Sequence, residues 1–278
     1  MLPQYHITTP LSLDHLHEMV PSAFATAAHE SRSDRYTYIP TSDVINGLMK
    51  EGFLPFAAKQ GNSKIKGKSD FTKHMIRFRH ENSMTNSKGD SLPEVVLINS
   101  HDGTSTYQLL SGLFRLVCLN GMVVPETRSS CIRVPHKGNI VDDVIEGSFK
   151  VLEESNNIIE TANLWREIEL KPREQLLLAK TAHRIRFEDA DGTLDTPIKP
   201  EQLLIPRRQD DVGDSLWLTH NRIQENITKG GLSGIRHEIG HRHRRVTTRN
   251  VNNIDQDVRL NRSLWELSSQ LAQWKQTA

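Results

Sequence analysis

Three residues near the C-terminal end have the types and spacing of a catalytic zinc site. His237, Glu238 and His241 spell H-E-x-x-H, in which two histidines one helical turn apart bind zinc and the glutamate activates a water molecule. That chemistry needs a stable helix and a third protein ligand. The glycines at 230–231 weaken a helix that leads into the motif, and the basic residues after it lack an apolar stripe. We therefore expect no metal, no cofactor and no enzymatic activity, and a zinc-dependent hydrolase remains the second alternative.

The charged residues are unevenly distributed along the chain. Between Lys59 and His80 seven Lys/Arg stand against one acidic residue, and from Asn226 onward nine stand against four. Between Gly138 and Glu225 the balance is reversed, at eleven against eighteen. This asymmetry favours an anionic partner that contacts the front stretch and the tail, and the alternative is two solvated faces that offset an acidic middle. The candidate nucleic-acid-binding residues are Lys59, Lys64, Lys66, Lys68, Lys73, Arg77, Arg79, Arg236, Arg242, Arg244, Arg245 and Arg249.

The composition is that of an ordinary globular chain. Of 278 residues, 36% are hydrophobic and 25% are charged, which allows one large domain or two small ones. No run has the length of a membrane span, and the first twenty residues do not resemble a secretory signal. The two cysteines, Cys118 and Cys131, make no disulfide framework. We expect a cytoplasmic protein that contacts no membrane, and we expect both of its thiols to be reduced.

The first half of the chain has the pattern of strands. Arg35–Pro40 is expected to form a short strand, and Thr41 or Ser42 to cap a helix that stops at Gly52. Residues 71–124 alternate and carry turn signals, which predicts an antiparallel meander. Asp102-Gly103 is typical of a two-residue hairpin loop and Asn120-Gly121 of a second turn.

The second half has helical spacing. One long helix is predicted from 140 to about 165, another beginning near Pro172, a third ending at Gly230-Gly231, and a last amphipathic helix. The apolar stripe of that last helix is Leu260, Leu264, Leu267, Leu271 and Trp274. The fold class is therefore α+β, an antiparallel β-meander followed by a long helix and a mainly helical C-terminal half. The expected domains are a weakly ordered segment 1–34, a core 35–165 and a helical region 166–278 with a basic loop.

Two motifs of the chain, N-S-H-D-G at 99–103 and R-L-V-C-x-N-G at 115–121, are specific in combination, although neither is a catalytic signature. Both lie in the second of four blocks, which are HMIRFRH at 74–80, VLINSHDGTSTYQLLSGLFRLVCLNGMVV at 96–124, HNRIQENITKGGL at 220–232 and VNNIDQDVRLNRSLWEL at 251–267. Together they resemble a phage- and plasmid-associated family catalogued as domain of unknown function 932. The resemblance covers roughly residues 53–265. Its pattern does not include H-E-x-x-H, so it adds no support for zinc at His237.

The strand–strand–strand–long helix order from 71 to 165 is similar, more distantly, to single-strand annealing proteins of the Rad fifty-two superfamily. That resemblance implies a homo-oligomer whose basic groove holds single-stranded DNA by its backbone. It is an analogy of fold only. It agrees with the two basic stretches, because a single-strand binder needs cations along the phosphates and stacking residues. Phe71 and Phe78 are candidates for stacking, and core packing is the preferred role of Phe78.

Three functions from different classes remain open. The leading hypothesis is a non-enzymatic nucleic-acid-binding protein of a mobile genetic element that binds or anneals single-stranded DNA. The first alternative is a protein-interaction module that inhibits host defence, and the second is the zinc hydrolase. Arg115 lies inside an apolar strand, where we expect a salt bridge, with Asp102 as a candidate partner, or a phosphate contact.

Overall fold

The computed structural model describes residues 9–27, 29, 38–63, 65, 67–85, 90–117, 120–124, 132–135, 139–236 and 243–277. The chain divides into two compact units. The first unit comprises Met1–Ile159 with Asn252–Ile254, and the second comprises Glu160–Val251 with Asp255–Ala278. The division falls inside one long helix, α4 (Ile140–Glu167), so each unit contains a part of this helix.

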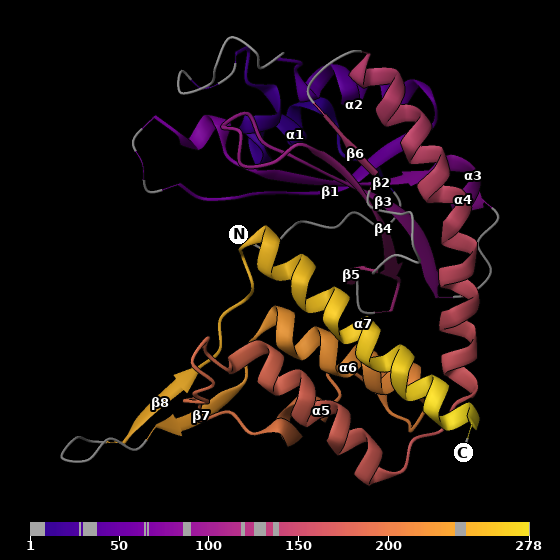
Figure 1. Cartoon of the computed structure of the whole chain (residues 1–278), viewed down its shortest axis with the longest axis vertical. Helices are drawn as coiled ribbons and strands as arrows, with labels where there is room; N and C mark the ends of the chain where they lie inside the picture. The colour runs from indigo at the N-terminus through magenta and orange to yellow at the C-terminus, as the bar shows by residue number, and fades with distance from the viewer. Residues whose placement is uncertain are drawn as a thin grey trace. The chain divides into compact units, whose positions relative to one another are not determined.

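The first unit is built on an antiparallel sheet. Its strands are β1 (Phe53–Gln60), β2 (His74–His80), β3 (Ser91–Asn99), β4 (Tyr107–Arg115), β5 (Asn120–Val123) and β6 (Ile132–Val134). From β1 to β5 each strand pairs with the next along the chain, and β6 also pairs with β4 (Figure 1). The predicted antiparallel meander is confirmed, and local pairing of successive strands explains its simple order.

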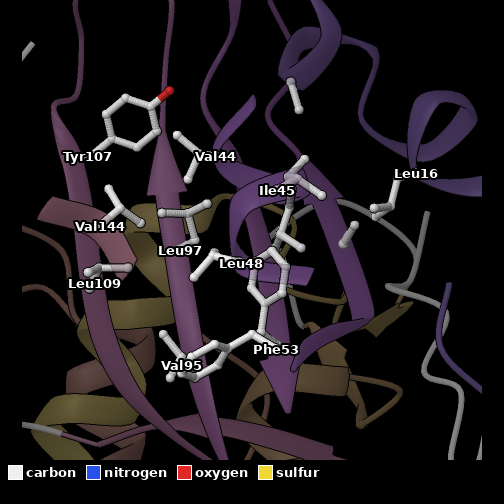
Figure 2. Close-up of a cluster of buried hydrophobic side chains, with 14 of the residues drawn as sticks. Leu16, Val44, Ile45, Leu48, Phe53, Val95, Leu97, Tyr107, Leu109 and Val144 are labelled. Carbon is white, nitrogen blue, oxygen red and sulfur yellow. The ribbon is translucent and has the colours of Figure 1, made fainter. Parts of the chain in front are cut away.

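One face of this sheet carries the apolar core. Successive strand residues point to opposite faces, so alternate residues of β2, β3 and β4 reach this core. Helices α1 (Leu13–Met19), α2 (Thr41–Lys50) and the start of α4 supply its other side. Figure 2 shows the cluster, with Leu16, Val44, Ile45, Leu48, Phe53, Val95, Leu97, Tyr107, Leu109 and Val144 labelled.

The start of α2 differs from the prediction. Its N-cap residue is Pro40, which makes no side-chain cap bond, so the capping role expected of Thr41 or Ser42 is wrong. The hydroxyl of Thr41 instead contacts a buried histidine cluster, described below. The helix ends as predicted, because Gly52 follows with φ 81°, a left-handed value that glycine adopts without strain.

Two predicted turns are also corrected. Gly103 has φ 78°, as a turn glycine should, but the connection from β3 to β4 runs from residue 100 to 106 and is not a two-residue loop. Asn120 and Gly121 lie in β5, where they pair with Arg115 and Phe114, rather than in a turn. A short helix, α3 (Glu81–Thr85), follows β2 directly. Of the strand expected at Arg35–Pro40, residues 38–40 are not in a strand, and residues 35–37 fall outside the described residues.

Short 3-10 turns complete both units. They are η1 (Pro21–Phe24), η2 (Ser69–Phe71), η3 (Pro200–Leu204) and η4 (Gln209–Asp211). The main helices of the second unit are α5 (Pro172–Phe187), α6 (Leu216–Lys229) and α7 (Ile254–Thr277), and a two-stranded ribbon, β7 (Ser233–Arg236) with β8 (Arg244–Thr247), follows α6. As predicted, Pro172 stands in the first turn of α5, and Gly230 ends α6 with φ 65°.

An aromatic cluster lies at the centre of the second unit. The ring centroid of Trp165 lies 4.4 Å from that of Trp265 and 5.2 Å from that of His220. The ring of His220 is nearly parallel to that of Trp217, at an interplanar angle of 3°. His220 Nδ1 is 2.9 Å from the Ser268 hydroxyl oxygen of α7. Burial lowers the pKa of His220 to about 3, so this histidine is neutral near pH 7.

The apolar stripe predicted for α7 is correct in part. Leu260 and Leu264 are buried, but Trp274 is 55% exposed. The fold class is confirmed as α+β, with the meander, the long helix α4 after it and a helical C-terminal half. Among the residues that the structure describes, no helix combines the length and apolar character needed to cross a bilayer.

Candidate nucleic-acid interface

The front stretch places two of its arginines inside the sheet. Arg77 and Arg79 are neighbours on one face of β2, and both are buried. Arg77 Nη1 donates to Glu94 Oε2 at 2.9 Å, and Arg79 Nε donates to Glu94 Oε1 at 3.0 Å. We call these three residues the ion-pair cluster. Their binding to a nucleic acid stays a prediction, but both guanidinium groups face Glu94 rather than solvent.

Neighbouring strands fit around the ion-pair cluster. The guanidinium of Arg79 lies 3.9 Å from the ring centroid of Phe114 and 4.3 Å from that of Phe56. The quadrupoles of both rings attract its positive charge. Arg77 also donates to the carbonyl oxygens of Gly121 and Met122 in β5, each at 3.3 Å. The cluster therefore cross-links β2, β3 and β5.

The front-stretch lysines that the structure describes, Lys59, Lys68 and Lys73, are not gathered on one exposed face. Lys59 is buried and Lys73 is half-buried. Lys68 is part-exposed, and its Nζ lies 3.3 Å from Asp102 Oδ2. Burial raises the pKa of Asp102, but hydrogen bonds from Thr104 and others, including Lys68, outweigh it and hold that pKa below its ordinary value. Lys64 and Lys66 lie outside the described residues.

The partner expected for Arg115 is corrected. Arg115 Nε donates to Asp90 Oδ2 at 3.0 Å, so this arginine is in a salt bridge, as preferred, but not with Asp102. Asp90 immediately precedes β3, and the pairing of Ser91 with Arg115 brings it close. Phe78 lies in the apolar core, the role preferred for it, and Phe71 packs edge-on against His29 at 5.3 Å between ring centroids.

His101, beside Asp102, belongs to a buried polar cluster. Thr41 Oγ1 lies 3.0 Å from His101 Nε2 and 3.1 Å from His74 Nε2, and Asn99 Nδ2 donates to the same oxygen at 3.1 Å. Burial, and then the charge of His101, lower the pKa of His74 to about 3. The cluster links α2 to the sheet, and its His74 is neutral near pH 7.

The tail stretch forms a projecting ribbon, which we call the basic ribbon (β7 and β8). Figure 1 shows it extending from the helices of the second unit. Ser233 pairs with Thr247, Gly234 with Val246, Ile235 with Arg245 and Arg236 with Arg244. Residues directly opposite one another in an antiparallel pair share a face. The basic ribbon therefore has two faces with different chemistry.

The face that carries Gly234 and Arg236 turns toward a neighbouring loop. A Cβ at Gly234 would lie 2.3 Å from the carbonyl oxygen of Pro197, so only glycine allows this approach. Arg236 Nη2 lies 3.2 Å from Asp195 Oδ2 and also donates to the Asp195 carbonyl. These contacts hold the basic ribbon against residues 195–197, and they neutralise Arg236 in part.

The opposite face of the basic ribbon is open. It presents Ile235, which is 58% exposed, beside the exposed Arg245. Arg245 Nη2 is 3.4 Å from the Ser233 hydroxyl oxygen, which lies 3.0 Å from that of Thr247. No carboxylate in the described part of the chain pairs with Arg245. A guanidinium and two hydroxyls on one surface are the donor types that phosphate oxygens accept from.

Two other tail arginines lie on or near the basic ribbon. Arg244 is exposed in β8, and Arg249 is exposed two residues after the strand ends. Arg242 lies outside the described residues, as do His237, Glu238 and His241. The described residues on either side of the H-E-x-x-H motif form paired strands, and no cluster of metal-ligating side chains occurs among the residues that the structure describes. The stretch that was expected to be a basic loop is therefore preceded by strand β7 and followed by strand β8.

Comparisons with known proteins identify relatives of this chain. It is 46% identical over 262 residues to the UPF0380 protein YafZ and 45% identical over 262 residues to the UPF0380 protein YfjQ, both of Escherichia coli strain K12. Each alignment covers 94% of this chain and 92% of the relative. No solved structure matches the chain. The family model described as domain of unknown function (DUF932) matches residues 28–265, and the chain belongs to this family.

Proposed function

We propose that this protein binds nucleic acid without enzymatic activity, and that it holds single-stranded DNA during annealing or replication of a mobile genetic element. The observation that carries the proposal is the open face of the basic ribbon. There Arg245 lies beside the hydroxyls of Ser233 and Thr247 and the exposed Ile235. Arg244 adds a second exposed cation on the same strand.

Phosphate binding follows from this chemistry. An arginine that contacts a phosphate releases condensed counterions, which favours binding whatever the base sequence. A short hydroxyl side chain adds a neutral hydrogen bond, and an exposed aliphatic side chain gives a base or sugar an apolar surface. Narrow two-stranded ribbons also fit the major groove of a duplex. The preference for single strands therefore rests on the similarity to annealing proteins, and it needs its own test.

The test compares fluorescently labelled single-stranded and double-stranded DNA of one sequence by anisotropy at two salt concentrations. We expect saturable binding to the single strand that weakens as salt rises, because phosphate contacts dominate. Tighter binding to the duplex would replace annealing with duplex recognition through the same ribbon. No binding to either form at low salt would contradict the proposal and favour a protein-interaction module.

A further inference from the structure

The first unit has a groove between the edge of its sheet and α4. Its volume is about 460 Å³, and it is lined on one side by residues 132–135 and on the other by one side of α4 from Asp143 to Glu154. Gly147 sets the distance between the two walls. A Cβ there would lie 2.7 Å from the Leu109 side chain and 3.1 Å from that of Ile132, so glycine lets the helix approach the strands closely.

The strand wall of this groove is a sheet edge. Within the described part of the chain, β4 is the strand that pairs with β6, and no other strand does. Tyr107 pairs with Val134, Gln108 with Arg133 and Leu109 with Ile132. The far side of such a strand offers backbone N–H and C=O groups to another extended segment. Pro135 limits this pairing to the three residues of β6.

The helix wall of the groove is acidic. The lining residues include four carboxylates and two cations, which are Asp143, Glu146, Glu153, Glu154, Arg133 and Lys150. Lys150 Nζ lies 2.6 Å from Glu146 Oε1, so one cation already has a partner on the same helix. Asp143 and Glu153 are exposed. The groove thus combines a strand edge with negative charge.

We propose that this groove binds an extended, basic segment of a partner protein, which adds to β6 as a further strand. The backbone of the segment hydrogen-bonds to the β6 edge, and its Lys or Arg side chains reach the carboxylates of α4. Strand addition supplies affinity through main-chain bonds, and charged walls supply the sequence preference. The same carboxylates repel phosphates, so this site is separate from the nucleic-acid interface proposed for the second unit.

The probe is a synthetic decapeptide that alternates arginine with valine, titrated into the full chain and followed by isothermal calorimetry. A second peptide of identical sequence carries N-methyl groups on alternate residues, which removes the donors of one strand edge and keeps every charge. We expect the first peptide to bind and the N-methylated peptide to bind about tenfold more weakly. Equal affinities would overturn strand addition, and so would the absence of any binding.

A charge-matched pair of variants tests the place of binding. Asp143→Asn with Glu153→Gln removes two groove carboxylates, and Glu160→Gln with Glu167→Gln removes two exposed carboxylates elsewhere on α4. We expect the groove variant to bind the peptide about fivefold more weakly and the control to bind like the wild type. Equal loss in both variants would show that the peptide responds to overall charge and would overturn the groove as its site.

Discussion

Arg236 and Arg245 lie on opposite faces of the basic ribbon, and this difference decides which of them is available to a phosphate. Arg236 is bound to Asp195, whereas Arg245 shares the open face with two hydroxyls. Arg77 and Arg79 are held by Glu94 in the sheet. A count of Lys and Arg along the sequence therefore includes residues with quite different opportunities to bind an anion.

Asp195→Asn is expected to strengthen DNA binding. The substitution releases Arg236 from its ion pair and removes a negative charge beside the basic ribbon. We expect affinity for single-stranded DNA to rise about two- to fivefold, in keeping with the weakness of exposed ion pairs. Asp210→Asn makes the same charge change at an exposed residue of η4. Equal gains in both variants, measured by anisotropy, would show that Arg236 is not the cause.

Glu94→Gln is expected to destabilise the first unit severely. Glu94 balances two buried guanidinium groups, and removal of its charge leaves both without their carboxylate. Breaking a buried ion pair in this way costs about 3 kcal/mol. The free energy of unfolding in urea measures the effect, and the exposed Glu153→Gln is the control. A change below about 0.5 kcal/mol would mean that Glu94 is not the charge that holds the ion-pair cluster.

Stability is expected to fall as pH falls from about 6.5 toward 3. Burial lowers the pKa values of His74 and His220 to about 3, below the ordinary histidine value of 6.5 that applies in the unfolded chain. Between these values the unfolded state binds more protons than the native state, so acid favours unfolding. Urea unfolding at several pH values measures the slope, and His220→Gln should lower it by about one proton. An unchanged slope would show that His220 does not titrate on unfolding.

The residue scale is where the sequence predicts least. Alternation along β2 correctly places Arg77 beside Met75 and away from Phe78. It does not show that Glu94 lies within reach, because that depends on the register of β3 against β2, which is a long-range property. The partner of Arg115 was wrong for the same reason: Asp90 becomes its neighbour only through the pairing of β3 with β4.

Elements with long periodic patterns are predicted well. The 3.6-residue spacing of apolar residues identifies α4, α5, α6 and α7, and Gly230 marks the end of α6. The strands of the basic ribbon were missed because each has four residues and neither face is buried in a core. What fixes them is their contact with residues 195–197, including the close approach of Gly234 to Pro197. The only local signal was the run of Arg, Val and Thr at 244–247.

Gly103→Val is expected to destabilise the connection between β3 and β4. Gly103 has φ 78°, which a β-branched side chain adopts only with strain, although the connection is longer than the two-residue loop first expected. The cost should be on the order of 1–3 kcal/mol in the free energy of unfolding. Thr106→Val, an exposed position in the same connection, serves as the control. Identical melting curves for the two variants would contradict this role for Gly103.

The whole chain has a formal net charge of +1, so its binding properties depend on where the charges lie. The second unit carries the basic ribbon, with Arg244 and Arg245 exposed. The first unit carries the acidic groove between β6 and α4. If both proposals hold, one chain offers a site for phosphates and another for a basic peptide. Those two ligands have opposite charges, so each should respond to a different set of variants.

The most direct test of nucleic-acid binding is the salt dependence of two charge-matched double variants. Arg244→Ala with Arg245→Ala removes the exposed arginines of β8, and Arg173→Ala with Lys180→Ala removes two exposed cations of α5. Each true phosphate contact contributes about 0.7 to the slope of log affinity against log salt on a single strand. The β8 variant should therefore bind single-stranded DNA more weakly, with a slope lower by about 0.7 for the open-face Arg245 and by about 1.4 where Arg244 on the other face also contacts phosphate, while the α5 variant keeps the wild-type slope. Equal slopes for the two variants would contradict the basic ribbon as the interface.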